Sequence, residues 1–179
     1  MKKIMFNDRY GLTQAVLEGR KTMTRRICKP QPEIITIEGH GYYSVHKKTH
    51  FHIGEVVAVA QNYGEIGLAA HIYEPGWDNK MFVKADLMPH QIRITNVRVE
   101  RLQDISDEDC LREGIIEQAI GVYRQWYVDG LQRPRHNDGV LASFLSPRAA
   151  FAALIDKVSG KGTWGSNLYV FVYEFELVK

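Results

Sequence analysis

The chain has little cysteine. Its 179 residues include only Cys28 and Cys110, and neither has a CxxC partner or a histidine at the spacing of a metal site. This absence argues against a structural zinc site. Two cysteines allow one disulfide, but the state that the composition favours is two free thiols in a reducing compartment, and we expect free thiols.

Long apolar runs are also missing. Met1-Lys2-Lys3 is followed by no hydrophobic stretch of the length that a signal peptide or a membrane-spanning helix needs. The sequence therefore predicts neither of these segments. We expect a cytoplasmic protein that has no membrane partner.

Several common catalytic motifs are absent. The sequence contains no glycine-rich phosphate-binding loop, no GxSxG and no HExxH, which argues against the common nucleotide-cofactor enzymes, serine hydrolases and zincins. The net charge is only +2. Because this charge is too small for a general polyanion binder, any contact with nucleic acid has to come from a local basic patch.

What the chain does have is enough apolar material for one core. Hydrophobic residues make up 45% of the sequence and aromatic residues 11%. At this length we expect a single domain over residues 1–179, with an insertion at about 117–145 that interrupts the main fold.

The hydrophobic periodicity predicts strands and helices that do not alternate regularly. This mixture favours an α+β domain with a twisted or barrel-like sheet and two or three covering helices. We expect strands at 3–6, 54–60, 81–83, 92–99 (with a bulge near Asn96) and 169–177, a hairpin at 34–37 and 42–45, a long excursion at 64–79, and helices at 12–18, 106–113 and 146–158.

The densest group of functional side chains is Gly19-Arg20-Lys21-Thr22-Met23-Thr24-Arg25-Arg26. It follows the predicted helix at 12–18, for which Thr13 is a candidate N-cap and Gly19 a stop. Strand-like alternation would place Lys21 and Arg25 on one face and Thr24 on the other, unless a turn or bulge brings Lys21 and Thr24 together. The alternative is an ordinary solvated basic face.

Three histidines, His46, His50 and His52, lie close together in the sequence. Their mixed spacing lacks a cysteine or carboxylate complement. We therefore predict no metal site there, and no metal or other cofactor elsewhere in the chain.

Five pieces of the chain, spread over nearly its whole length, carry a family resemblance. They are Leu17–Arg26, Gly54–Val56, Val97–Ser106, Glu113–Gly114 and Gly162–Asn167 followed by Tyr173–Phe175. In this order they resemble the ASCH domain, a PUA-like β-barrel family associated with RNA, and in particular members found in phage and prophage. The resemblance implies a PUA-like barrel and a ligand of the nucleotide or RNA type.

The resemblance also implies site residues. The small bacterial ASCH enzymes that remove the acetyl group from N(4)-acetylcytidine use a lysine, a threonine and a glutamate, which Lys21, Thr24 and Glu113 match. Thr24 stands where the wider family signature has an acid, so a role that needs a carboxylate there is in doubt. The expected ligand-binding residues are Gly19, Arg25, Arg26, Tyr63, Trp164 and Asn167.

Three functions follow as hypotheses. The first is amide hydrolysis of an N-acylated pyrimidine nucleoside, with Thr24 as nucleophile, Lys21 as its base and Glu113 orienting the lysine or shuttling protons. The second is a non-catalytic module that binds a modified nucleoside or single-stranded RNA through Lys21, Arg25 and Arg26, together with aromatic side chains such as Tyr63 or Trp164. The third is a ribonuclease, for which the sequence offers no convincing pair of acid and base histidines. A purely structural role for the charged residues remains the alternative to all three.

Overall fold

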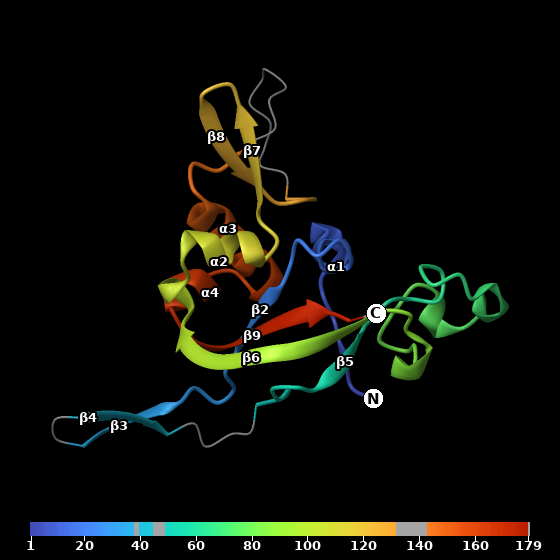
Figure 1. Ribbon diagram of the computed structural model, residues 1–179, viewed down its shortest axis with the longest axis horizontal. Coiled ribbons are helices and arrows are strands. Elements are labelled where there is room, and N and C mark those ends of the chain that lie inside the picture. Colours follow the sequence, from blue (N-terminus) through green and yellow to red (C-terminus); the bar gives the residue numbers. More distant parts are fainter. Residues whose placement is uncertain (38–39, 45–48, 132–142, 179) are drawn as a thin grey trace.

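The computed structural model of the protein describes residues 1–37, 40–44, 49–131 and 143–178 (Figure 1). It confirms the α+β class, because helices pack on a central sheet of five strands. β1 and β5 run parallel, and the other neighbours are antiparallel. In sheet order the strands are β1 (Lys3–Ile4), β5 (Val56–Val59), β6 (Gln91–Arg101), β9 (Tyr169–Leu177) and β2 (Met23–Ile27).

The sheet has two edges among the described residues. These edges are β1 and β2, and no ladder between described strands joins them. Closure of the sheet into the barrel that we expected therefore stays a prediction.

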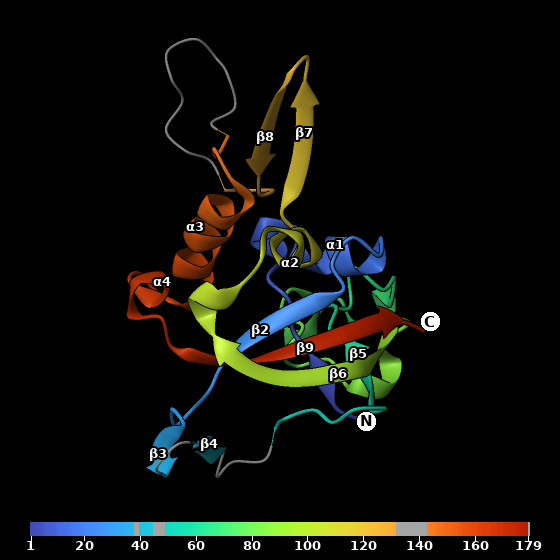
Figure 2. The same ribbon diagram turned by 60° about the vertical axis from the view of Figure 1, so that its left-hand side comes forward.

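β6 and β9 form the long antiparallel pair of the sheet, in which Val97 lies opposite Tyr173. The register shifts between Ile94 and Asn96, which confirms the irregularity predicted near Asn96. Residues 169–173 of β9 are buried, since β6 and β2 pair with its two sides and helices lie over the sheet (Figure 2).

The three predicted helices are present, and two of them begin at the expected caps. The Ser106 hydroxyl accepts a hydrogen bond from the Asp109 amide, and the Ser146 hydroxyl accepts one from the Ala149 amide, each at 3.1 Å. α1, α2 and α3 lie on one side of the sheet in both views (Figures 1 and 2). The helices are α1 (Leu12–Leu17), α2 (Asp107–Arg112), α3 (Pro147–Ser159) and the short α4 (Thr163–Ser166).

The start of α1 differs from the prediction. Thr13 is not its N-cap, because α1 begins at Leu12 directly after Gly11, which has a left-handed backbone (φ 63°). The Thr13 hydroxyl instead donates to the Asp8 carboxylate at 2.5 Å. The predicted stop is confirmed, since Gly19 has the positive φ (72°) that ends many helices.

Two hairpins extend the fold. The predicted hairpin near residues 34–45 is present as β3 (Glu33–Ile37) and β4 (His40–Ser44). A second hairpin, β7 (Ile116–Ile120) and β8 (Tyr123–Tyr127), projects away from the sheet within the expected insertion (Figure 2). Residues 132–142 of that insertion lie outside the described residues.

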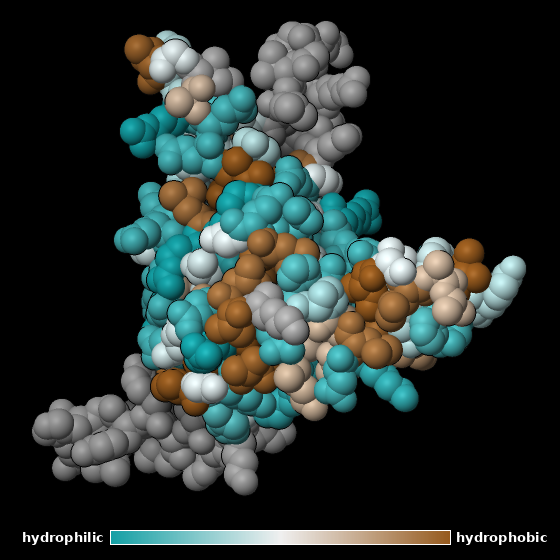
Figure 3. Space-filling view, turned by 45° about the vertical axis from the view of Figure 1, so that its right-hand side comes forward, coloured by the Kyte–Doolittle hydropathy of each residue, from teal (hydrophilic) through white to brown (hydrophobic). Residues whose placement is uncertain are grey.

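The segment from residue 61 to residue 90 is the long excursion expected from its glycines, and it contains three short 3₁₀ helices, η2 (Ala69–His71), η3 (Pro75–Trp77) and η4 (Ala85–Leu87). Our strand prediction at 81–83 is wrong. The carbonyls of Lys80, Met81 and Val83 accept hydrogen bonds from the Lys3 ammonium instead of joining a ladder. Exposed hydrophobic residues, among them Tyr73 and Phe82, gather on this segment (Figure 3).

Both cysteines are buried and free, as predicted. Burial raises the pKa of the Cys28 thiol to about 11 and that of the Cys110 thiol to about 12. In the described part of the chain, no helix combines the length and the apolar character that crossing a bilayer requires.

Candidate functional site

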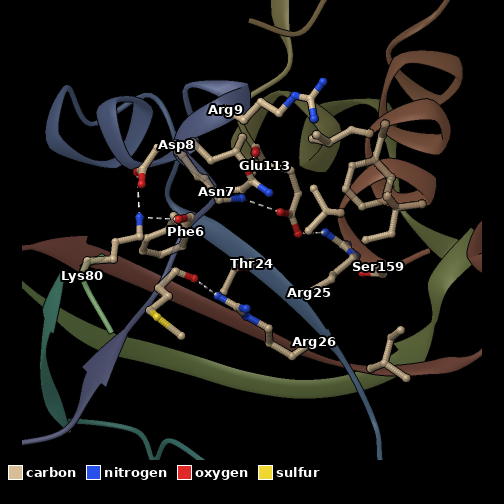
Figure 4. A pocket seen from close by; sticks show the side chains of 18 of the residues that line it. Phe6, Asn7, Asp8, Arg9, Thr24, Arg25, Arg26, Lys80, Glu113 and Ser159 are labelled. Carbon is tan, nitrogen blue, oxygen red and sulfur yellow. Dashed lines mark hydrogen bonds and ion pairs between the residues drawn. The ribbon is translucent and has the colours of Figure 1, made fainter. Parts of the chain in front are cut away.

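Five of the predicted site residues line one cavity. Lys21, Thr24, Arg25, Arg26 and Glu113 lie on the wall of a cavity of about 780 Å³ (Figure 4). This volume falls within the range of about 300–1,000 Å³ that is usual for ligand pockets. The residues come from two parts of the chain that the fold brings together, the segment 21–26 and the end of α2.

A pair of backbone contacts positions Lys21 and Glu113. After Gly19, the Lys21 amide donates to the Ala15 carbonyl (2.9 Å), and the Thr22 amide donates to the Arg112 carbonyl (3.0 Å). These bonds hold the segment that leads into β2 against the last turn of α2, where Glu113 is the C-cap residue. The side chains of Lys21 and Glu113 therefore meet before β2 begins.

Gly114 completes this junction. Its φ of 101° lies in a region that side chains rarely adopt. A Cβ atom there would also lie 3.4 Å from Leu12 Cδ2 and 3.7 Å from Lys21 Cδ. These distances are ordinary contacts, so it is the backbone conformation that favours glycine directly after Glu113.

Lys21 and Glu113 form a buried ion pair. Lys21 Nζ lies 2.6 Å from Glu113 Oε2 and 2.8 Å from the Glu113 carbonyl oxygen. The side chains are only 2% and 5% exposed. Desolvation by burial lowers the pKa of Lys21, while the Glu113 carboxylate opposes that shift, and the net direction is downward. Such a lysine gives up its proton more readily than a solvated one.

Arg25 contacts the second carboxylate oxygen of Glu113, Oε1. Its Nη1 donates to Glu113 Oε1 (3.2 Å), and its Nη2 donates to Glu100 Oε1 (2.5 Å) and Asp109 Oδ2 (2.9 Å). Burial alone would lower the pKa of Arg25, but the three carboxylates raise it above its ordinary value. We expected Arg25 to bind ligand. Because its donors are used within the protein, it acts as a positioning residue for Glu113.

The pair continues into a larger charge network behind the cavity. Arg98 donates to Glu100 (3.0 Å), Asp109 (2.8 Å) and Glu174, and Arg112 donates to Glu174 (2.8 Å). Within the described residues the network is balanced, because four cations face four carboxylates. They are Lys21, Arg25, Arg98 and Arg112 with Glu100, Asp109, Glu113 and Glu174.

Thr24 is buried and lines the same cavity as Lys21 and Glu113. Strand alternation alone would place Lys21 and Thr24 on opposite faces. The turn between α1 and β2 instead brings Lys21 to the cavity that Thr24 lines, which is the alternative that the sequence analysis included. The Thr24 hydroxyl makes no hydrogen bond within the described part of the chain, to Lys21 or to any other residue. The hydroxyl is therefore available to a ligand.

The rest of the cavity wall is largely apolar. Part of it comes from the face of α3 that packs toward the sheet, which also carries core residues. A flat ring can lie against such a wall while its polar edge reaches the Lys21–Glu113 pair. The apolar lining residues are Met5, Phe6, Leu12, Ile27, Phe151, Leu154, Ile155 and Val158.

Further cations line the cavity, of which Arg26 was an expected ligand-binding residue and Arg9, Lys29 and Lys80 were not. Arg9, Arg26 and Lys29 are exposed and have no carboxylate partner among the residues that the structure describes. Arg26 donates one bond, from Nη2 to the Met5 carbonyl at 2.6 Å. Lys80, by contrast, is paired with Asp8 at 2.6 Å (Figure 4). Nothing in the local sequence around Arg9, Lys29 or Lys80 distinguishes them from solvated cations.

Four predicted ligand-binding residues do not line this cavity. Gly19 serves as the helix stop. Tyr63 lies in a second hydrophobic cluster, stacked on His71 with ring centroids 4.3 Å apart. Trp164 packs edge to face on Phe151 at 6.1 Å, and the Asn167 side-chain oxygen accepts a bond from the Gln103 amide at 2.8 Å. The structure thus gives Gly19, Tyr63, Trp164 and Asn167 structural contacts.

The described residues contain no group of three His, Cys, Asp or Glu side chains that could hold a metal ion. His50 and His52 belong to the described residues, whereas His46 lies outside them. The prediction that no metal takes part stays a prediction, and a chelator tests it.

Comparison with known proteins adds no relative. The chain matches no protein-family model, no curated protein and no solved structure.

Proposed function

We propose that the protein is an ASCH-type amidohydrolase with a PUA-like fold, which removes the acyl group from an N-acylated pyrimidine nucleoside such as N(4)-acetylcytidine. One observation carries the proposal. The buried Lys21–Glu113 pair shares a cavity wall with the unbonded hydroxyl of Thr24. A base, a group that orients it and a nucleophile in one cavity are the parts that covalent amide hydrolysis needs.

The first step prepares the base. The Lys21 ammonium transfers a proton to the Glu113 carboxylate across the 2.6 Å contact, which leaves a neutral amine and a carboxylic acid. Burial favours loss of the Lys21 proton, because desolvation disfavours the charged ammonium. Arg25 holds Glu113 in place during the exchange.

Acylation of the enzyme follows. The Lys21 amine takes the Thr24 hydroxyl proton as Thr24 Oγ1 bonds to the amide carbonyl carbon, which forms a tetrahedral oxyanion. Collapse of this intermediate breaks the carbon–nitrogen bond. The Lys21 ammonium returns the proton to the departing amino group, so that cytidine leaves and an acyl ester remains on Thr24.

Hydrolysis of the ester closes the cycle. The Lys21 amine removes a proton from water as the water oxygen attacks the ester carbonyl, and the Thr24 oxygen leaves with that proton. The products are a carboxylic acid and the free threonine. Arg26 is the cation placed to stabilise the oxyanion in both steps, since only one of its donors has a partner among the described residues.

The direct test is release of cytidine from N(4)-acetylcytidine by the purified protein, followed by chromatography in excess EDTA. We expect release that depends on protein concentration and persists in the chelator. No release from the parent protein would overturn the proposal. Release that EDTA abolishes would remove its metal-independent mechanism.

A specific observation favours a second candidate, a non-catalytic module that binds a nucleoside or single-stranded RNA. The Thr24 hydroxyl has no hydrogen bond to Lys21 in this structure, although catalytic bonds in ligand-free enzymes often tighten only when substrate binds. The module would bind through its unpaired cations. Binding that does not change between low and moderate salt, or that survives Arg26→Ala, would exclude this candidate.

The ribonuclease hypothesis gains nothing from the cavity. No histidine is among the described residues that line it. Incubation with labelled single-stranded RNA in EDTA tests this activity, and we expect no cleavage even at high protein concentration.

A further inference from the structure

A second cavity adjoins the first. Its volume is about 380 Å³, which is also within the range of about 300–1,000 Å³ for ligand pockets. Arg26, Ile27 and Lys29 line both cavities. The chain at residues 26–29 therefore forms a wall between two neighbouring spaces.

The shared wall carries two cations that the protein does not neutralise. Neither Arg26 nor Lys29 has a carboxylate partner among the described residues. Two other lining cations have partners: Lys80 pairs with Asp8, and the Lys3 ammonium is bonded to three carbonyls. Arg9 lines the first cavity only. Guanidinium and ammonium groups are the two cationic side-chain types that bind phosphate, the first through a planar fork of donors and the second as a point charge.

Three aromatic core residues form part of the wall of the second cavity. Phe51 and Tyr173 meet edge to face with centroids 5.4 Å apart, and Phe171 lies next to Tyr173 at 6.1 Å. Ile4 and Ile27 add aliphatic surface, and His50 adds a polar edge. A planar ligand with polar edges, such as a nucleobase, fits this combination.

We propose that the two cavities bind two adjacent nucleotides of one strand. The acylated cytidine occupies the first cavity, the neighbouring base occupies the second, and Arg26 and Lys29 hold the phosphodiester between them. The inference rests on the proposed function for the chemistry in the first cavity. It adds the substrate class, because the preferred substrate becomes an oligonucleotide and not a free nucleoside.

Three substrates distinguish binding of a terminal phosphate from binding of a phosphodiester. They are N(4)-acetylcytidine, its monophosphate, and a dinucleotide that has N(4)-acetylcytidine on either side of the linkage. We expect kcat/KM to rise by about tenfold or more from nucleoside to dinucleotide, since one charge-assisted hydrogen bond is worth about that factor. The monophosphate should fall between them, and a dinucleotide with an abasic neighbour should behave like the monophosphate.

The matched variants are Lys29→Gln and Lys161→Gln. Lys29→Gln should remove most of the preference for the dinucleotide. Lys161 is exposed and lines neither cavity, so Lys161→Gln should leave all efficiencies unchanged. Arg26→Gln is the less selective probe, because we also assign Arg26 to the oxyanion and expect a lower kcat on every substrate.

Binding keeps the inference separate from the amidohydrolase proposal. If no substrate is hydrolysed, that proposal fails, but calorimetry with unmodified cytidine and a cytidine-containing dinucleotide still tests the two cavities. Tighter binding of the dinucleotide that is lost in Lys29→Gln supports the inference. Equal binding or equal kcat/KM for nucleoside and dinucleotide overturns it, as does a monophosphate that matches the dinucleotide or a preference that survives in Lys29→Gln.

Discussion

Lys21 Nζ lies 2.6 Å from Glu113 Oε2, although 92 positions separate the two residues in the chain. Both side chains are buried, and the Glu113 carboxylate opposes the lowering of the Lys21 pKa that burial causes. A buried pair of this kind costs free energy of desolvation, and hydrophobic residues often replace one without loss of stability. The Lys21–Glu113 pair lines the same cavity as Thr24, which is the reason for assigning the pair a chemical role.

The Thr24 hydroxyl should be essential for turnover but not for folding. Thr24→Val keeps the shape of the side chain and removes the oxygen, which makes no hydrogen bond in the described structure. We expect kcat to fall on the order of a thousandfold or more, as when a catalytic nucleophile is deleted. Thr24→Ser is the control, since it restores a hydroxyl and should retain measurable turnover. Equal activity of the two variants would rule out Thr24 as the nucleophile.

The pH dependence of kcat/KM should reveal the ionisation of Lys21 and the influence of Glu113 on it. Burial lowers the pKa of Lys21 and Glu113 opposes this shift, so that kcat/KM should rise with pH through a pKa below the ordinary lysine value. Glu113→Gln removes the opposing charge, which should move this limb to still lower pH. Glu117→Gln is the control, because Glu117 lies on β7 and pairs with Arg124 outside the cavity. A limb that stays in place in Glu113→Gln would contradict the role of Lys21 as the base.

The buried arginine should be costly to remove. Arg25→Met leaves Glu113, Glu100 and Asp109 without a cation that contacts all three. We expect the free energy of unfolding to fall by about 3–5 kcal/mol, measured by urea denaturation. Arg124→Met breaks an exposed ion pair and should cost less than about 1 kcal/mol. Similar losses in the two variants would show that the network does not stabilise the fold.

The two thiols should weaken the folded state at high pH. The pKa of Cys28 is raised to about 11 and that of Cys110 to about 12, from an ordinary value of 9.0. Between pH 9 and 11 the unfolded thiols lose their protons while the folded thiols keep them, so the free energy of unfolding falls as pH rises. Urea denaturation should show a smaller fall in the double variant Cys28→Ala, Cys110→Ala. Parallel curves for parent and variant would contradict this prediction.

Local sequence signals predicted most of the regular elements. Ser106 and Ser146 mark helix starts through hydrogen bonds that span three residues, and the β9 strand begins with five consecutive apolar or aromatic residues. The strand prediction at 81–83 is wrong. A residue far away in the sequence, Lys3, donates hydrogen bonds to backbone carbonyls of residues 80–83, and a local pattern does not reveal such a contact. The sequence analysis did not predict the short helix α4 or the β7–β8 hairpin within the expected insertion.

The candidate site was predictable only in part. Lys21, Thr24 and Glu113 were selected through a resemblance, whereas their convergence depends on the contact between Thr22 and Arg112 far along the chain. Composition also could not show that Arg25 is buried and neutralised, because its three carboxylates come from β6 and the region of α2. Aromatic residues such as Tyr63 were chosen by type, and the type does not reveal whether a ring faces a cavity or a core.

The most direct test of the account is a mutational cycle on N(4)-acetylcytidine hydrolysis in EDTA. It compares kcat/KM for the parent, for Lys21→Met, Thr24→Val and Glu113→Gln, and for the triple variant, with circular dichroism to verify that each is folded. If the three residues act as one unit, each single change should lower kcat/KM by a similarly large factor, and the triple variant should be little worse than the singles. Full activity in folded Lys21→Met, or losses that multiply in the triple variant, would contradict the account.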